Sequence, residues 1–251
     1  MVHSKQVAIW AVLAGAGFFA GAAFAGHPLQ TEDTGTQGVG KVELENGLSW
    51  SNTAGTQLFA FEPQVAYGLT PTVDLIVQPS WLRSRDESGL TVRGWGDTIV
   101  DGKWRFVDDE ALSFAVRAGV SLATSQNGLG IEHGKVSTHA VLVATYEAAP
   151  FTVHGNLGLT QNPGGTEERT LIGRVSGALT WAANDALTLA VDAGAESNPD
   201  PTRRVWISSL LAGAIYTLRP ELDVDVGYQS SLNAPINTHV WLVGLTYRFA
   251  L

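Results

Sequence analysis

The chain has 251 residues, including 28 Gly, 8 Trp, 1 Met and no Cys, and its formal net charge is −9. Without cysteine it can form neither a disulfide framework nor a cysteine-linked lipid anchor. The negative charge and the lack of a basic cluster argue against nucleic acid as a partner. After the N-terminal 25 residues, no segment reaches the roughly 18 uncharged apolar residues that a spanning helix needs.

Residues 1–25 have the pattern of a secretory signal peptide. Lys5 precedes a long apolar run, and the segment closes on Ala23-Phe24-Ala25, which fits a small-x-small cleavage site. An uncleaved transmembrane helix is the alternative, but the A-x-A ending and the absence of a stop-transfer pattern favour removal. We therefore expect export, with the mature chain beginning near Gly26.

From Gly40 to the end, polar and apolar residues alternate with a period of two, which indicates successive β-strands. Within 222–229, the apolar positions fall on one face, while Asp223, Asp225, Gly227 and Gln229 fall on the other. Each such segment is about as long as a tilted strand that crosses a hydrocarbon core. The pattern predicts twelve strands, at 40–50, 57–68, 72–82, 96–106, 111–123, 136–147, 151–161, 170–181, 186–196, 204–217, 221–229 and 237–250.

The connections between these strands alternate between short and long. Short turns are expected at 69–71, 107–110, 148–150, 182–185 and 218–220, with longer polar segments at 51–56, 83–95, 124–135, 162–169, 197–203 and 230–236. Outer-membrane barrels have short turns at the periplasmic rim and longer loops at the other. An even number of strands then places both ends of the barrel on the periplasmic side.

Aromatic residues fall beside these connections, as expected for the girdles at the two membrane interfaces. One predicted ring lies beside the short turns and comprises Tyr67, Phe106, Tyr146, Trp181, Tyr216 and Tyr247; the other comprises Trp50, Trp81, Trp206 and Tyr228. A soluble all-β sandwich also has alternating strands, but it would explain neither the rings nor the alternating loop lengths. The sequence therefore predicts an all-β, transmembrane, antiparallel up-and-down β-barrel of about twelve strands over 39–251.

The last strand, 239–251, resembles the C-terminal signal that the barrel-assembly machinery reads, although Leu251 stands where that signal usually has an aromatic residue. Residues 27–38, the strand with Glu43, and the run Gly94-Trp95-Gly96-Asp97 leading to Lys103-Trp104-Arg105-Phe106 are similar to the MetA-pathway of phenol degradation family. That resemblance covers essentially the whole mature chain. It implies an outer-membrane transporter or channel associated with hydrophobic or aromatic compounds, and no catalytic residues.

Many inward positions are small, which favours a narrow lumen over a solid core of side chains. Rings of charged side chains select solutes in pores, so charges of both signs here could filter them. The alternative is that these charges only pair with one another. The candidates for lining the lumen are Glu43, Glu45, Glu62, Asp74, Asp97, Asp101, Lys103, Arg105, Arg117, Arg174, Asp192, Asp223, Asp225 and Arg248.

Residues 26–38 are polar and rich in glycine, and either fold back as a partial plug at the periplasmic mouth or form a disordered tail. An outer-membrane lipase could use Ser137 and His139, which share a strand face, but no G-x-S-x-G motif is present. The histidines lack metal-ligand spacing. We therefore predict a channel for small solutes in the outer membrane, in contact with its lipid and without catalytic residues, metal or cofactor, with a lipase-type or structural barrel as the alternative.

Overall fold

The computed structural model describes residues 27–125, 135–164, 168–233 and 237–251. The predicted signal peptide, residues 1–25, lies outside the described residues. In the described ranges the chain forms fourteen strand segments, all paired antiparallel in one sheet. No helix in these ranges is long and apolar enough to span a membrane.

The strand segments follow the chain without crossovers, apart from one broken hairpin near the start. Their bounds are β1 Lys41–Thr53, β2 Thr56–Thr70, β3 Val73–Gln78, β4 Trp81–Arg85, β5 Thr91–Trp95, β6 Thr98–Asp108, β7 Leu112–Leu122, β8 Ser137–Ala148, β9 Phe151–Gln161, β10 Leu171–Ala182, β11 Leu187–Glu196, β12 Ile207–Arg219, β13 Leu222–Ser231 and β14 Thr238–Ala250.

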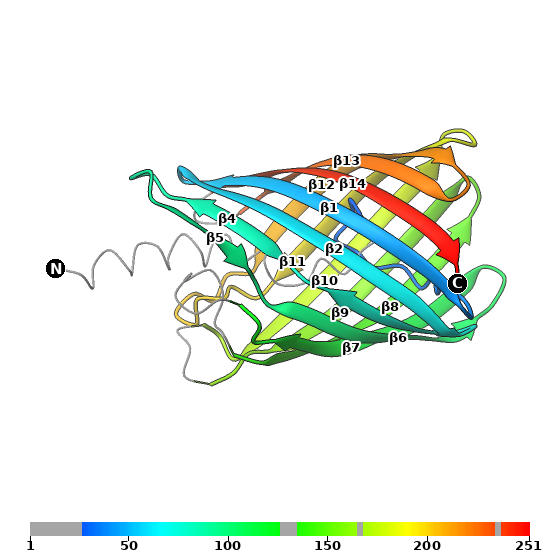
Figure 1. Cartoon of the computed structure of the whole chain (residues 1–251), viewed down its shortest axis with the longest axis horizontal. Helices are drawn as coiled ribbons and strands as arrows, with labels where there is room; N and C mark the ends of the chain where they lie inside the picture. Colours follow the sequence, from blue (N-terminus) through cyan, green and yellow to red (C-terminus); the bar gives the residue numbers. More distant parts are fainter. Residues whose placement is uncertain (1–26, 126–134, 165–167, 234–236) are drawn as a thin grey trace.

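The sheet closes on itself because β1 pairs with both β14 and β2. Segments β3 and β4 pair with the same partner, β2, and are separated only by Pro79-Ser80; Gly96-Asp97 likewise separates β5 from β6. Proline cannot donate to a strand ladder, which explains the first break. The described segments therefore form a closed barrel of twelve strands (Figure 1), which confirms the predicted fold class.

Alternate residues of each strand point into the barrel, and these are mostly the polar ones. On β13, Asp223, Asp225 and Gln229 are buried, whereas Val226 and Tyr228 are 47% and 37% exposed. A soluble sandwich would bury the apolar face instead, so that alternative is wrong. The exposed apolar surface is the one that a membrane-spanning barrel turns towards lipid.

The connections divide the two ends of the barrel into a turn rim and a loop rim. The turn rim holds the turns 71–72, 109–111, 149–150, 183–186 and 220–221, the start of β1 and the end of β14. The opposite, loop rim holds the connections 54–55, 86–90 and 197–206. The backbone N–H of Leu251 donates to the carbonyl of Gly40 at 2.9 Å, so the two barrel ends meet at the turn rim. The predicted alternation of short and long connections holds in most places.

Two of the predicted long segments at the loop rim are wrong. Residues 51–56 belong mainly to β1 and β2, which are joined by a two-residue turn with Ala54 and Gly55 at φ of 48° and 82°. Positive φ at both central residues is the geometry that matches strand twist in tight hairpins. Residues 83–95 similarly contain parts of β4 and β5, with a turn only at 86–90.

The strand predicted at 204–217 begins later, at Ile207, and continues to Arg219. Its two faces do alternate, with Ile207 and Leu211 buried at 5% and 0% and Leu210 49% exposed. The sequence pattern is obscured because apolar residues occupy the inward face here as well as the outward one.

The predicted aromatic residues lie on the outward face near the two rims. At the turn rim, Phe106, Tyr146, Trp181, Tyr216 and Tyr247 are all at least 40% exposed. At the loop rim, Trp50 and Trp206 are exposed to a similar degree. These positions agree with the two girdles expected from the sequence.

Candidate functional site: the lumen and its N-terminal segment

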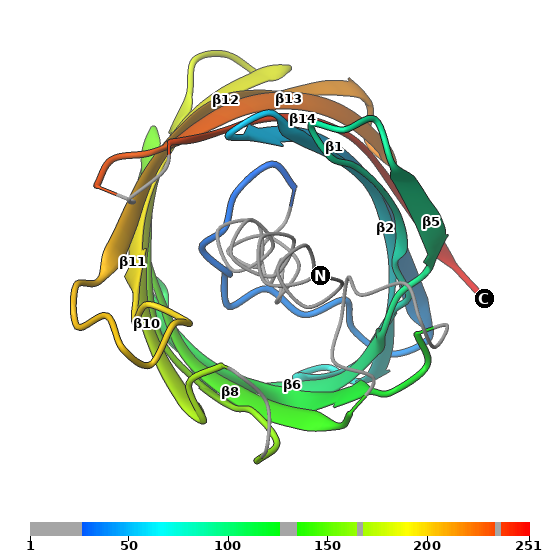
Figure 2. The same cartoon turned by 90° about the vertical axis from the view of Figure 1, so that its left-hand side faces the viewer.

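The N-terminal residues before β1 run inside the barrel. Figure 2, which looks from the loop rim, shows this segment (blue) within the ring of strands. We call residues 27–37 the lumen segment. Thr31, Glu32 and Thr34 in it are 1%, 4% and 3% exposed, so the barrel wall encloses the middle of the segment.

The first two residues of the segment, His27 and Pro28, contact strands β12 and β13 of the wall. His27 Nδ1 is hydrogen-bonded to the carboxylate of Asp225. Pro28 packs on Gly213 and Gly227, where an added Cβ would lie only 2.8 Å and 2.9 Å from the proline ring. Since these two glycines are paired across β12 and β13, they form a flat surface that the ring can approach.

Asp192 on β11 holds Gln30 and Thr31. Its carboxylate accepts the backbone N–H groups of Gln30 and Thr31 at 2.7 Å and 2.8 Å, and the Thr31 hydroxyl at 3.0 Å. Three donors on one buried carboxylate satisfy it without a cation.

Glu32 lies at the centre of a buried charge network. Lys103 Nζ donates to one carboxylate oxygen at 2.6 Å and Arg117 Nη1 to the other at 2.7 Å. Arg117 Nε also donates to Asp101 at 2.7 Å, and Asp101 accepts from His139 Nε2 at 2.7 Å. The network joins the segment to strands β6, β7 and β8.

The backbone of the segment is also bonded to the wall. Asn156 accepts from the N–H of Glu32 at 2.7 Å and donates to its carbonyl at 2.9 Å, as a neighbouring strand would. Further on, the N–H of Thr34 donates to Thr145 Oγ1 at 3.2 Å, and the Thr34 hydroxyl is hydrogen-bonded to Ser113.

Gln37 fixes the end of the segment at the turn rim. Its N–H donates to both carboxylate oxygens of Asp74 at 3.2 Å and 3.0 Å, and its side-chain amide donates to Glu43 at 2.8 Å. Glu43 also accepts from Arg248, which donates in turn to Asp223 at 2.6 Å. Polar contacts therefore hold the segment along its whole length.

The other predicted lumen residues lie apart from the segment or make different contacts. Arg174 pairs with Glu196 at 2.6 Å, nearer the loop rim. Asp97 lies in the break between β5 and β6 and accepts the N–H of Ser125 at 2.9 Å, so it belongs to a loop contact. Glu45 is buried on β1. Glu62 is on the inward face of β2 and is paired with Gly47 of β1.

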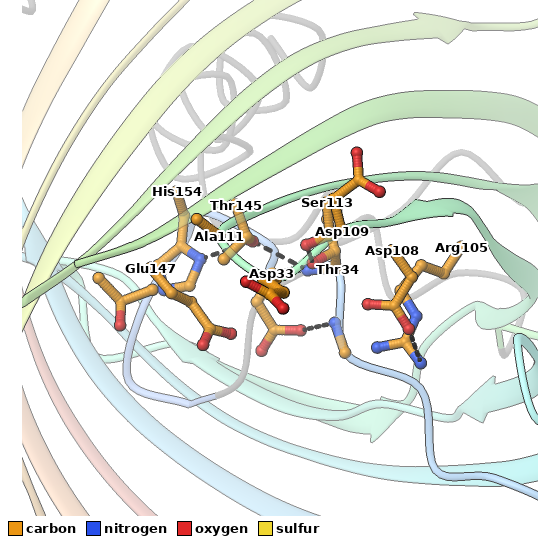
Figure 3. Close-up of a pocket in the computed structure, with 13 residues that line it drawn as sticks. Asp33, Thr34, Arg105, Asp108, Asp109, Ala111, Ser113, Thr145, Glu147 and His154 are labelled. Carbon is orange, nitrogen blue, oxygen red and sulfur yellow. Dashed lines mark hydrogen bonds and ion pairs between the residues drawn. The ribbon is translucent and has the colours of Figure 1, made fainter. Parts of the chain in front are cut away.

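A cavity of about 550 Å³ opens beside the segment at the turn rim. Figure 3 shows carboxylates of Asp33, Asp108, Asp109 and Glu147 around it, with Arg105 and His154. Arg105 Nη2 lies 3.1 Å from Asp108. The neighbouring Lys103 ammonium is the main reason that the pKa of Asp33 is lowered from its ordinary value, so Asp33 carries a negative charge at this mouth.

Several residues of this network were not among the sequence candidates, although inward parity could have indicated some of them. Gln64, which accepts from Arg117 Nη2 at 3.0 Å, occupies an inward strand position, as do His139 and Asn156. Uncharged residues at such positions do not stand out in a sequence. His27 and Glu32 precede the first strand, where no periodicity predicts an orientation. His139, considered with Ser137 as a catalytic pair, instead donates to Asp101.

No family model matches the chain, and no curated protein matches it in sequence. The fold is similar to that of an outer membrane channel from Pseudomonas putida F1, with 12% identity over 86% of this chain and 98% of that one and a TM-score of 0.74. A KdgM porin in complex with disordered oligogalacturonate has 8% identity over 82% and 99%, TM-score 0.59. The CymD monoaromatic hydrocarbon channel has 9% identity over 85% and 89%, TM-score 0.50. At these identities the likeness establishes the fold.

Proposed function

We propose that the chain is an outer-membrane channel through which small solutes diffuse, and that the lumen segment narrows its passage. The observation that carries the proposal is a membrane-type barrel whose interior is lined by charged side chains of both signs. Apart from Pro28, which packs on Gly213 and Gly227, the lumen segment is bound to this lining by hydrogen bonds and ion pairs. Such contacts can be exchanged for contacts with water, so the segment could vary in position while the barrel stays intact.

Two arguments bear on the solute class that we propose. Lys103 pairs with Asp33 at 3.3 Å, Arg105 with Asp108 at 3.1 Å and Arg248 with Glu43 at 2.7 Å. Closely spaced charges of both signs suit small polar or dipolar molecules. The resemblance to the MetA-pathway of phenol degradation family, and the fold shared with a monoaromatic hydrocarbon channel, favour hydrophobic or aromatic compounds instead. Small aromatic molecules with polar substituents would satisfy both arguments.

The remaining parts of the proposal concern the route to the membrane. We propose that residues 1–25 are a signal peptide, that the turn rim faces the periplasm, and that the assembly machinery reads β14. A lipase-type activity has less support, because no hydrogen bond joins Ser137 to His139 among the described residues, and Nε2 of His139 is hydrogen-bonded to Asp101. We therefore propose that the barrel is not an enzyme.

Single-channel recording in a planar bilayer tests the proposal, with heat-modifiable gel migration as the check on folding. We expect discrete conductance steps, and a shift towards cation selectivity when Arg105 at the mouth is replaced in R105Q. The control, R203Q, removes an equal charge from an exposed loop where Arg203 pairs with Asp200. A folded protein that never conducts, or a selectivity that changes equally in both variants, would contradict the channel.

A further inference from the structure

The outward face of the β4–β5 hairpin carries three exposed arginines near the loop rim: Arg83 and Arg85 on β4, and Arg93 on β5. Arg83 and Arg93 are directly opposite each other in the strand pairing. Side chains in such a pair have Cβ atoms about 5 Å apart, and like charges there destabilise a sheet. An arrangement that costs free energy in the isolated barrel calls for a compensating anion.

No carboxylate among the residues that the structure describes provides that anion. In the described parts of the chain, no ion pair joins a carboxylate to Arg83, Arg85 or Arg93. The two acidic residues of the hairpin turn, Asp86 and Glu87, form no ion pair with these arginines. Asp86 accepts the Ser88 hydroxyl at 2.6 Å and the Leu90 N–H at 2.9 Å, and Glu87 lies against Gly55 of the neighbouring turn.

The arginines point towards the membrane side of the wall. Leu82, next to Arg83, is buried and packs with Leu58 and Ala60 inside the barrel. Arg83 is paired with Phe59 and therefore shares its outward face. A groove of about 430 Å³ lies on this surface and is lined by Trp50, Ser51, Asn52, Gln57, Leu58, Phe59, Arg83 and Arg85.

Aromatic rings lie next to the arginines, one step closer to the middle of the barrel. Trp81 is opposite Trp95 and contacts Phe59, with ring centroids 6.0 Å apart; Phe59 also contacts Trp50, at 5.3 Å. Aromatic rings mark the boundary of the hydrocarbon layer. Arg83 follows Trp81 in β4 towards the loop rim. If the rings mark the hydrocarbon boundary, Arg83 is on the headgroup side of it.

We propose that the three arginines of this face bind the phosphate of a phosphorylated glycolipid in the surrounding leaflet, next to the exposed aromatic rings. Guanidinium groups donate to phosphate in a bidentate manner and remain charged at every physiological pH. One phosphate between Arg83 and Arg93 would turn their repulsion into a shared contact, while acyl chains cover the rings. The inference rests on the proposed outer-membrane placement, with the loop rim facing outwards.

Native mass spectrometry of the refolded protein in detergent, titrated with a diphosphorylated glucosamine-disaccharide lipid, tests the site. We expect R83Q/R93Q to bind at least tenfold more weakly than the unmodified protein. The control R203Q/R204Q removes the same charge from another connection at the same rim and should bind normally. R83K/R93K should be intermediate, because it keeps the charge but not the bidentate geometry.

The dephosphorylated lipid provides a test that needs no variant. It should bind the unmodified protein no better than the phosphorylated lipid binds R83Q/R93Q. Equal binding of the two lipids, or equal loss in the control variant, would overturn the site. Conductance in bilayers without glycolipid should be the same for R83Q/R93Q and the unmodified protein, so failure of the lipid site and failure of the channel can be told apart.

Discussion

Glu32 makes two charge-assisted contacts with the barrel wall, through Lys103 and Arg117. Each hydrogen bond to a charged group contributes about 1.5–3 kcal/mol. We expect E32Q to loosen the lumen segment and to increase the time spent in a larger conductance state roughly tenfold or more. The barrel itself should keep its heat-modifiable migration, since the network can be hydrated from the lumen.

The matched control for this prediction is E110Q, because Glu110 is exposed in the turn 109–111 at the turn rim. It removes one carboxylate without touching the segment. Identical open-state occupancy in E32Q and E110Q would show that the Glu32 network does not hold the segment.

Asp33 gives the segment a dependence on pH. Its pKa is lowered, chiefly by Lys103, so the stabilisation from this pair is fully present above the unfolded pKa of about 4. It is lost as pH falls through the lower, folded value. Hydrogen exchange of the segment amides should show this loss in the unmodified protein below about pH 4, and a smaller change in D33N over the same range. An equal pH response in both proteins would rule out Asp33 as its source.

At the scale of elements, the glycines of β12 and β13 determine where the segment begins. In G227A, the new methyl group would meet the Pro28 ring at 2.9 Å, so we expect residues 27–31 to be displaced and the Gln30 and Thr31 amides to exchange faster. Gly102 is the control, because an added Cβ there has nothing within 4 Å. Unchanged amide exchange of Gln30 and Thr31 in G227A would mean that the contact between Pro28 and the two glycines does not position the segment.

The strands were predictable from the sequence because burial in a barrel follows strict alternation. On β13, for example, the polar Asp223 and Asp225 are buried inside the barrel, whereas Val226 and Tyr228 are exposed on its outer face. The breaks were less predictable: the pattern carries straight through Pro79, and the predicted strand 72–82 spans what the structure shows as β3 and the start of β4. The tight turn at Ala54-Gly55 was missed because alanine rarely adopts positive φ.

At the scale of the whole molecule, most of the predicted inward charges do face the lumen, but their partners could not be predicted. Arg117 contacts Glu32, which is 85 residues away in the chain, and Asp192 contacts Thr31 at a separation of 161. Such contacts depend on the path of a segment without periodicity. The sequence left open whether residues 26–38 form a plug or a tail; in the structure, the described part of this range lies in the lumen.

The most direct test of a channel narrowed by its own N-terminal segment is a reversible lock. Thr34 and Ser113 are hydrogen-bonded through their side chains, and the chain has no native cysteine, so T34C/S113C introduces one pair that can form a disulfide. Single-channel recordings should show one small, steady conductance under oxidising conditions, with transitions to larger levels after reduction. Conductance that is the same before and after reduction, in protein shown to be cross-linked, would contradict the account.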